Sequence, residues 1–157
     1  MKTRIAALLL AAMTICGCGQ RDPKVFEENL CGVCRSLETE CLQIEAMFKW
    51  MNQMGEMSGF NDSKGKDGKD TMRSLVLDSR KRLAPKLAAL KPAPAEKQPA
   101  VDLANQLFRD TEAAGNAMDF SGPATESRKT AATMAVKTMR ATKTALSRAA
   151  PPGCIEP

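Results

Sequence analysis

The chain has 157 residues, a formal net charge of +5, six cysteines and neither histidine nor tyrosine. Its length suits a single domain. The lack of an imidazole excludes Ser-His-Asp and Cys-His hydrolases, zinc sites with histidine ligands, iron sites with two histidines, and the attachment of c-type haem. We therefore predict a protein that is not an enzyme, with no metal or dissociable cofactor and no inferred small-molecule substrate.

The first residues have the features of an export signal. Lys2 and Arg4 precede the apolar run 5–15, IAALLLAAMTI. This run is about half of the roughly 20 residues that a membrane-spanning helix needs, and it suits the apolar region of a secretory signal. We therefore predict a signal peptide over residues 1–17 and no membrane span there.

The sequence Ile15-Cys16-Gly17-Cys18 follows the apolar run, and it resembles the lipobox of bacterial lipoprotein precursors. The resemblance implies cleavage after Gly17, a lipid on Cys18, and a lipidated tether over residues 18–22. By analogy with enterobacterial sorting, Gly19 favours the periplasmic face of the outer membrane over the inner membrane. An ordinary cleaved signal with a soluble periplasmic product is the alternative, and both alternatives export the chain.

The rest of the chain is rich in Ala, Met, Leu, Lys and Glu and poor in Ile and Val, which favours helices over strands. We predict an all-α fold, an antiparallel up-down-up-down four-helix bundle that occupies residues 23–157. The helices are expected at about 23–57, 70–91, 99–119 and 123–149.

The first helix has the clearest signals. Asp22 is the expected N-cap, and Pro23 stands at the first helical position. Apolar residues then alternate in steps of four and three: Leu30, Cys34, Leu37, Cys41, Ile44, Phe48 and Met51. This spacing predicts one buried face along the whole helix.

The later helices show weaker stripes. In the second, Pro85 predicts a kink or a restart near Ala84, and Arg80, Lys81 and Arg82 are expected mostly outside. The inward residues of the second helix are expected to be Met72, Val76, Ser79, Leu83, Leu87 and Leu90. Those of the third are Ala104, Leu107, Phe108, Thr111, Ala114 and Met118, and those of the fourth are Ala132, Ala135, Val136, Met139 and Leu146.

Export to an oxidising compartment predicts disulfides among Cys31, Cys34, Cys41 and Cys154. Cys34 and Cys41 lie about 10.5 Å apart along a helix, beyond the roughly 7 Å that a disulfide allows. The favoured pairs are therefore Cys31 with Cys34 and Cys41 with Cys154. Cys34 with Cys154 is the competing pair if Gly32 breaks the helix or if one pair stays reduced.

Two sulfur motifs suggest other chemistry. Cys31-Gly32-Val33-Cys34 has the spacing of thiol-disulfide oxidoreductases, but no βαβ pattern surrounds it, so a structural disulfide is favoured. A group of methionines around Trp50 could hold Cu(I) through soft thioether sulfurs, although the same spacing is typical of a core stripe. These are Met47, Met51, Met54 and Met57.

The last helix carries several cations, Lys129, Lys137, Arg140, Lys143 and Arg148. They could meet anionic headgroups or an acidic partner, but a solvated face is the favoured interpretation. Nucleic acid is not an expected partner for an exported chain with one tryptophan and this modest charge.

Two hypotheses of function follow. The leading one is a non-catalytic lipoprotein of the cell envelope, held at the membrane by its acyl chains. It would present a helix face or the loop 58–70 to a protein partner. The alternative is a small periplasmic thiol-redox or Cu(I)-binding protein that uses the Cys31 motif or the methionine group.

Overall fold

The computed structural model describes residues 22–54, 78–118 and 125–156, which form helices and short connections with no strand among them. The all-α prediction is confirmed for these residues. In chain order they contain α1 (Pro23–Met54), helical residues 78–88, the 3-10 helix η1 (Ala95–Lys97), α3 (Gln98–Ala117) and α4 (Glu126–Ala149). Within these ranges, no helix has both the length and the apolar character that a membrane crossing requires.

The beginning of α1 follows from its capping residues. Asp22 accepts a hydrogen bond from the backbone N–H of Lys24 through Oδ1 (2.9 Å), and its carbonyl accepts one from Phe26 (3.0 Å). Pro23 is the first helical residue, where its missing N–H costs nothing. The predicted stripe of α1 is buried, apart from the half-buried Phe48. Its expected last turn, 55–57, lies outside the described residues.

Side-chain pairs define how α1 lies against its neighbours. Lys97 pairs with Glu27, Thr111 bonds to Glu40, and a Cβ on Gly115 would lie 3.3 Å from Cδ1 of Ile44. Residue numbers rise together in these pairs, so α1 and α3 run parallel. Towards α4 the numbers run oppositely, in the pairs Cys31 with Cys154, Glu38 with Lys143, and Glu45 with Arg140.

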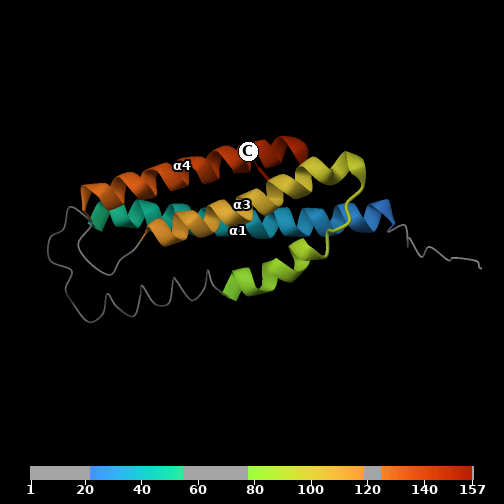
Figure 1. Ribbon diagram of the computed structural model, residues 1–157, viewed down its shortest axis with the longest axis horizontal. Helices are drawn as coiled ribbons and strands as arrows, with labels where there is room; N and C mark the ends of the chain where they lie inside the picture. The colour runs from blue at the N-terminus through green and yellow to red at the C-terminus, as the bar shows by residue number, and fades with distance from the viewer. Residues whose placement is uncertain (1–21, 55–77, 119–124, 157) are drawn as a thin grey trace, which may run out of the picture.

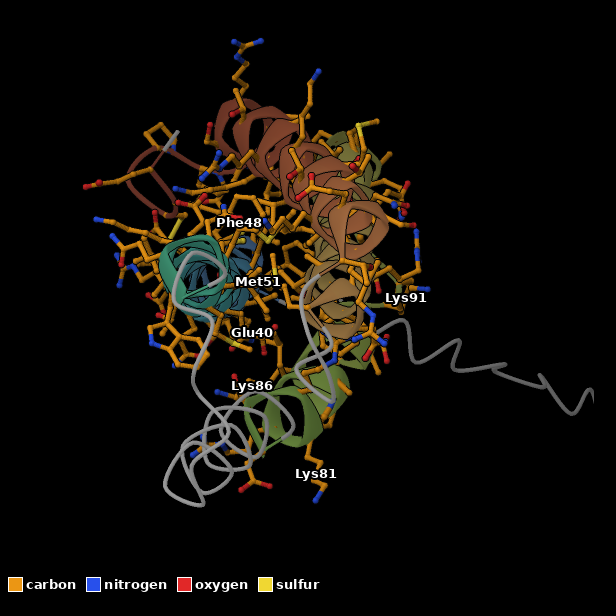
Figure 2. All side chains as sticks on the ribbon, turned by 90° about the vertical axis from the view of Figure 1, so that its left-hand side faces the viewer. Glu40, Phe48, Met51, Lys81, Lys86 and Lys91 are labelled. Carbon is orange, nitrogen blue, oxygen red and sulfur yellow. A yellow bond between two sulfur atoms is a disulfide. The ribbon has the colours of Figure 1, made fainter. Side chains whose placement is uncertain are left out.

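The helical residues 78–88 complete the described core. Figure 1 shows them in green on one side of α1, with α4 on the other, and the end-on view of Figure 2 agrees. Leu83, Leu87 and Leu90 are buried as predicted, whereas the expected start of this helix at 70–77, with Met72 and Val76, lies outside the described residues. The helix continues through Pro85 to residue 88, so the chain does not restart near Ala84.

The stripes of α3 and α4 are also close to those predicted. Ala104, Leu107, Thr111, Ala114 and Met118 are buried, and Phe108 is half-buried. On α4, Ala132, Val136, Met139 and Leu146 are buried, with Ala135 half-buried. Helices α3 and α4 pack on each other, and the small side chains of their stripes allow the two helices to approach closely.

Candidate functional site

A disulfide between Cys31 and Cys154 fastens the C-terminal segment to α1, with Cα atoms 4.7 Å apart. After α4 ends, the turn 151–153 reverses the chain, and Gly153 adopts φ +77°, a left-handed conformation that suits glycine. The backbone N–H of Glu156 donates to Oε1 of Glu38 at 3.1 Å, and Ile155 is buried. The C-terminus is therefore held by a covalent bond, a hydrogen bond and apolar packing.

This pairing differs from the favoured one. Neither Cys31 with Cys34 nor Cys41 with Cys154 is joined, and the competing pair Cys34 with Cys154 is absent too, because Cys34 and Cys41 are buried free thiols. The favoured pairing assumed that all four cysteines form disulfides. The antiparallel register of α1 and α4, with Lys143 at Glu38, instead carries Cys154 past Cys41 to the level of Cys31.

The two thiols lie in an environment that suppresses their reactivity. Burial, reinforced by the charge of Glu38, raises the pKa of Cys34 to about 11. Burial also raises the pKa of Cys41 to about 12, although Lys143 opposes the increase. Since the thiolate is the nucleophile and the metal ligand, both groups are protonated and inert at neutral pH.

The thiol arrangement predicts a simple labelling pattern. We expect iodoacetamide near neutral pH to leave Cys34 and Cys41 unmodified in the native protein and to modify both after unfolding. Non-reducing peptide mass mapping with fragmentation should locate the cross-link at Cys31 and Cys154. Rapid modification of Cys34 in the native protein would contradict its burial.

A buried polar cluster joins three helical segments, and the sequence did not reveal it. Glu40 on α1 and Thr111 on α3 are both fully buried, and Arg80, expected outside, is 9% exposed. Ser79 donates to Oε1 of Glu40 at 2.8 Å, and Thr111 donates to its Oε2 at 3.4 Å. Figure 2 shows Glu40 on the side of α1 that faces residues 78–88, while Lys81 points away from the bundle.

The guanidinium of Arg80 contacts most members of this cluster. Its Nη1 lies 3.9 Å from Oε2 of Glu40 and donates to Thr111 Oγ1 at 3.1 Å. Its Nη2 donates to the carbonyl of Phe108 at 2.9 Å and to Oε2 of Glu112 at 3.0 Å. The guanidinium carbon also lies 3.9 Å from the centre of the Phe108 ring, within range of a cation–π contact. The guanidinium is thus shared between two carboxylates, a carbonyl, a hydroxyl and a ring.

Desolvation dominates the electrostatics of Glu40. Burial raises the pKa of its carboxyl group, whereas the hydrogen bond from Ser79, the charge of Arg80 and the hydrogen bond from Thr111 lower it in part. A sequence signal for this cluster does exist. Glu40 interrupts an otherwise apolar row on α1, and Arg80 precedes the apolar row of the next helix at the same spacing. These rows are Val33, Leu37, Ile44, Met47 and Met51, and Leu83, Leu87 and Leu90.

The basic residues of α4 are only partly a solvated face. Arg140 donates through Nε to Oε1 of Glu45 at 2.9 Å, and Lys143 lies 3.3 Å from Oε1 of Glu38. Lys129 pairs within α4 with Glu126, at 3.1 Å. The other two cations, Lys137 and Arg148, are exposed. Two of the five cations therefore align α4 on α1.

The methionine group lies partly in the core. Met47 and Met51 are each 6% exposed, as expected of a core stripe. The side chain of Met54 and all of Met57 lie outside the described residues, as does the predicted lipid attachment at Cys18. Among the residues that the structure describes, no group of three or more cysteine or carboxylate side chains could hold a metal ion.

The described residues form helices that a disulfide cross-links and that enclose a buried polar cluster. The two cysteines of the Cys31-Gly32-Val33-Cys34 motif are in different states. Cys31 forms a disulfide with Cys154, and Cys34 is a buried free thiol. The chain matches no protein-family model, and neither a similar curated protein nor a similar solved structure was found.

Proposed function

We propose that this protein is a non-catalytic lipoprotein of the bacterial cell envelope, anchored through a lipid on Cys18. Its helical domain, an antiparallel up-down-up-down four-helix bundle, would bind or brace a protein partner. Residues 78–88 would belong to the second helix. The outer membrane, on its periplasmic face, is the favoured location.

The observation that carries this proposal is the disulfide between Cys31 and Cys154. Structural disulfides persist in oxidising compartments and are rare in the cytosol, so this bond and the signal-like residues 1–17 both point to export. The two inferences are independent, since one depends on the N-terminal sequence and the other on the register of α1 and α4.

The position of the disulfide suits an anchored domain. Cys31 lies in the first half of α1, the part closest along the chain to Cys18. The cross-link therefore ties the C-terminal segment to the end of the domain that would face the membrane. Residues near Met54 lie about 35 Å from Cys31 along the helix, which would place them well into the periplasm.

The arrangement of the thiols gives little support to the redox alternative. A redox motif of this kind needs Cys31 and Cys34 to exchange a disulfide and one of them to have a low pKa. Here Cys31 is joined to Cys154, and burial raises the pKa of Cys34 to about 11.

The anchor is tested by replacing the acylated cysteine. We expect Cys18→Ser either to move the chain from the membrane fraction to the soluble fraction or to leave residues 1–17 uncleaved, because a serine cannot carry the thioether-linked lipid. Cys16→Ser, two positions earlier, is the matched control and should stay in the membrane. Mass spectrometry of the membrane-extracted protein should find the lipid on Cys18 and residues 1–17 removed. Unmodified, unprocessed protein in the cytosol would contradict the proposal.

A further inference from the structure

A shallow groove lies between the second half of α1 and the middle of α4. Its volume is about 600 Å³, and both helices contribute to its lining. Its lining consists of Leu42, Glu45, Ala46, Phe48, Lys49 and Arg140, together with the amide side chains of Asn52 and Gln53. We name this surface the Leu42 groove.

Three residues that line the Leu42 groove are apolar and reach solvent. Leu42 is 59% exposed, Ala46 is exposed, and Phe48 is half-buried. Leu42 departs from the pattern of α1, whose other leucines, Leu30 and Leu37, are fully buried. Apolar side chains on a concave, solvent-facing surface offer a place for the apolar side chains of a partner.

The dimensions of the groove suit a helix. Its lining on α1 extends from residue 42 to residue 53, which corresponds to about 16 Å, or three helical turns. A helix that lies in such a groove makes contact through side chains at positions i, i+3 or i+4, and i+7, which span a similar length.

The charges at the rim favour an acidic occupant. Lys49 is exposed. Arg140 donates through Nε to Oε1 of Glu45, its Nη groups make no hydrogen bond within the described residues, and its side chain is 56% exposed. Two cations against one carboxylate leave the rim positive. A guanidinium with unused donors is well suited to bind a carboxylate in two-pronged geometry.

We propose that the Leu42 groove binds an amphipathic helix of a partner protein. Its apolar side chains would lie on Leu42 and Ala46, and its Asp or Glu side chains would face Lys49 and Arg140. This inference rests on the proposed function, since it gives the chemistry of the protein partner. A second copy of this chain would bring the same positive rim against itself, so self-association is disfavoured.

The test uses two designed peptides and the full chain, purified from whichever cell fraction contains it. Both peptides are amphipathic helices with the same leucine stripe, one flanked by Glu and the other by Lys. Trp50, the only tryptophan, adjoins Lys49 and provides a fluorescence readout. We expect the Glu-flanked peptide to bind and the Lys-flanked peptide to bind at least about tenfold more weakly.

Variants locate the binding. Leu42→Glu should raise the Kd of the Glu-flanked peptide about tenfold or more, because it replaces an apolar side chain that lines the groove with a charged one. Met134→Glu is the matched control, since Met134 is 58% exposed and does not line the groove, and it should change the Kd less than about twofold. Lys49→Glu should raise the Kd of the Glu-flanked peptide and lower the Kd of the Lys-flanked peptide.

Three results would overturn the proposal: no binding, equal binding of the two peptides, or equal effects of Leu42→Glu and Met134→Glu. A dimer in light scattering that Leu42→Glu dissociates would assign the groove to self-association instead. Because the peptides are tested on purified protein, these outcomes are separate from the Cys18→Ser fractionation. The fractionation can therefore contradict the lipid anchor while the peptide titration supports the groove, and the reverse is also possible.

Discussion

Replacing Cys154 by serine is expected to lower the free energy of unfolding by about 4 to 5 kcal/mol, because the disulfide closes a very long loop in the unfolded chain. Cys31 and Cys154 are separated by 123 positions in the sequence. The bond also holds the segment that contains Ile155, which packs into the core only if the turn after α4 stays in place. The measurement is denaturant unfolding under non-reducing conditions.

Two controls make this result specific to the observed pair. The double variant Cys31→Ser with Cys154→Ser should be about as stable as either single variant, since each removes the same bond. Cys41→Ser should leave the cross-link intact in mass mapping, because Cys41 is a free thiol. If Cys41→Ser abolished the cross-link, the pair favoured by the sequence, Cys41 with Cys154, would be present instead.

Replacing Arg80 by methionine should lower the free energy of unfolding by about 3 kcal/mol near neutral pH, because it leaves the Glu40 carboxylate buried without its cation. The variant also removes the donors that reach Thr111, the Phe108 carbonyl and Glu112. Methionine retains most of the apolar stem, so the loss reports on the charge and its hydrogen bonds. Chemical denaturation with helicity as the readout measures it.

Glu40→Gln is the contrasting variant in the same cluster. The amide keeps one oxygen, which can accept from Ser79, while the Thr111 hydroxyl can donate to the carbonyl of Phe108 (2.9 Å). Since the amide also avoids the cost of burying a charge, its stability should lie within about 1 kcal/mol of the unmodified protein. Adding Glu40→Gln to Arg80→Met should restore part of the loss. If Arg80→Met alone were neutral, Glu40 would not depend on this arginine.

The same carboxyl group predicts a pH dependence. Burial raises the pKa of Glu40 above its usual value of 4.5. Between the pKa of the unfolded state and that of the folded state, the folded state therefore binds a proton more readily than the unfolded state. The stability that this proton provides is complete below the unfolded pKa, and it is lost as the pH rises through the folded pKa. Unfolding free energies measured across this window should decrease with pH for the unmodified protein relative to Glu40→Gln. An identical pH profile for both proteins would contradict the raised pKa.

The proposed lipid anchor depends on the sequence, whereas the proposed partner site depends on the fold. The lipobox-like residues lie before the described range, and the Leu42 groove gained its definition only from the packing of α4 beside α1. Cys18→Ser and the peptide titration therefore test two separate parts of the proposed function.

The sequence by itself determined where α1 begins and which apolar face of that helix is buried. Asp22 and Pro23 specify the start of α1 through local hydrogen bonding, and the apolar spacing specifies its buried side, because both depend on neighbours within a few residues. The restart considered near Ala84 does not occur, since the helix continues through Pro85 for three further residues.

Only the tertiary structure decided which cysteine meets Cys154 and that Arg80 and Glu40 are buried together. Both depend on the register between helices far apart in the chain, and helical periodicity is unchanged when one helix slides along another. The pairs of Glu38 with Lys143 and of Glu45 with Arg140 define that register for α1 and α4, and it places Cys154 at Cys31. Charge and spacing alone could not distinguish an exposed Arg80 from one that pairs with a carboxylate on another helix.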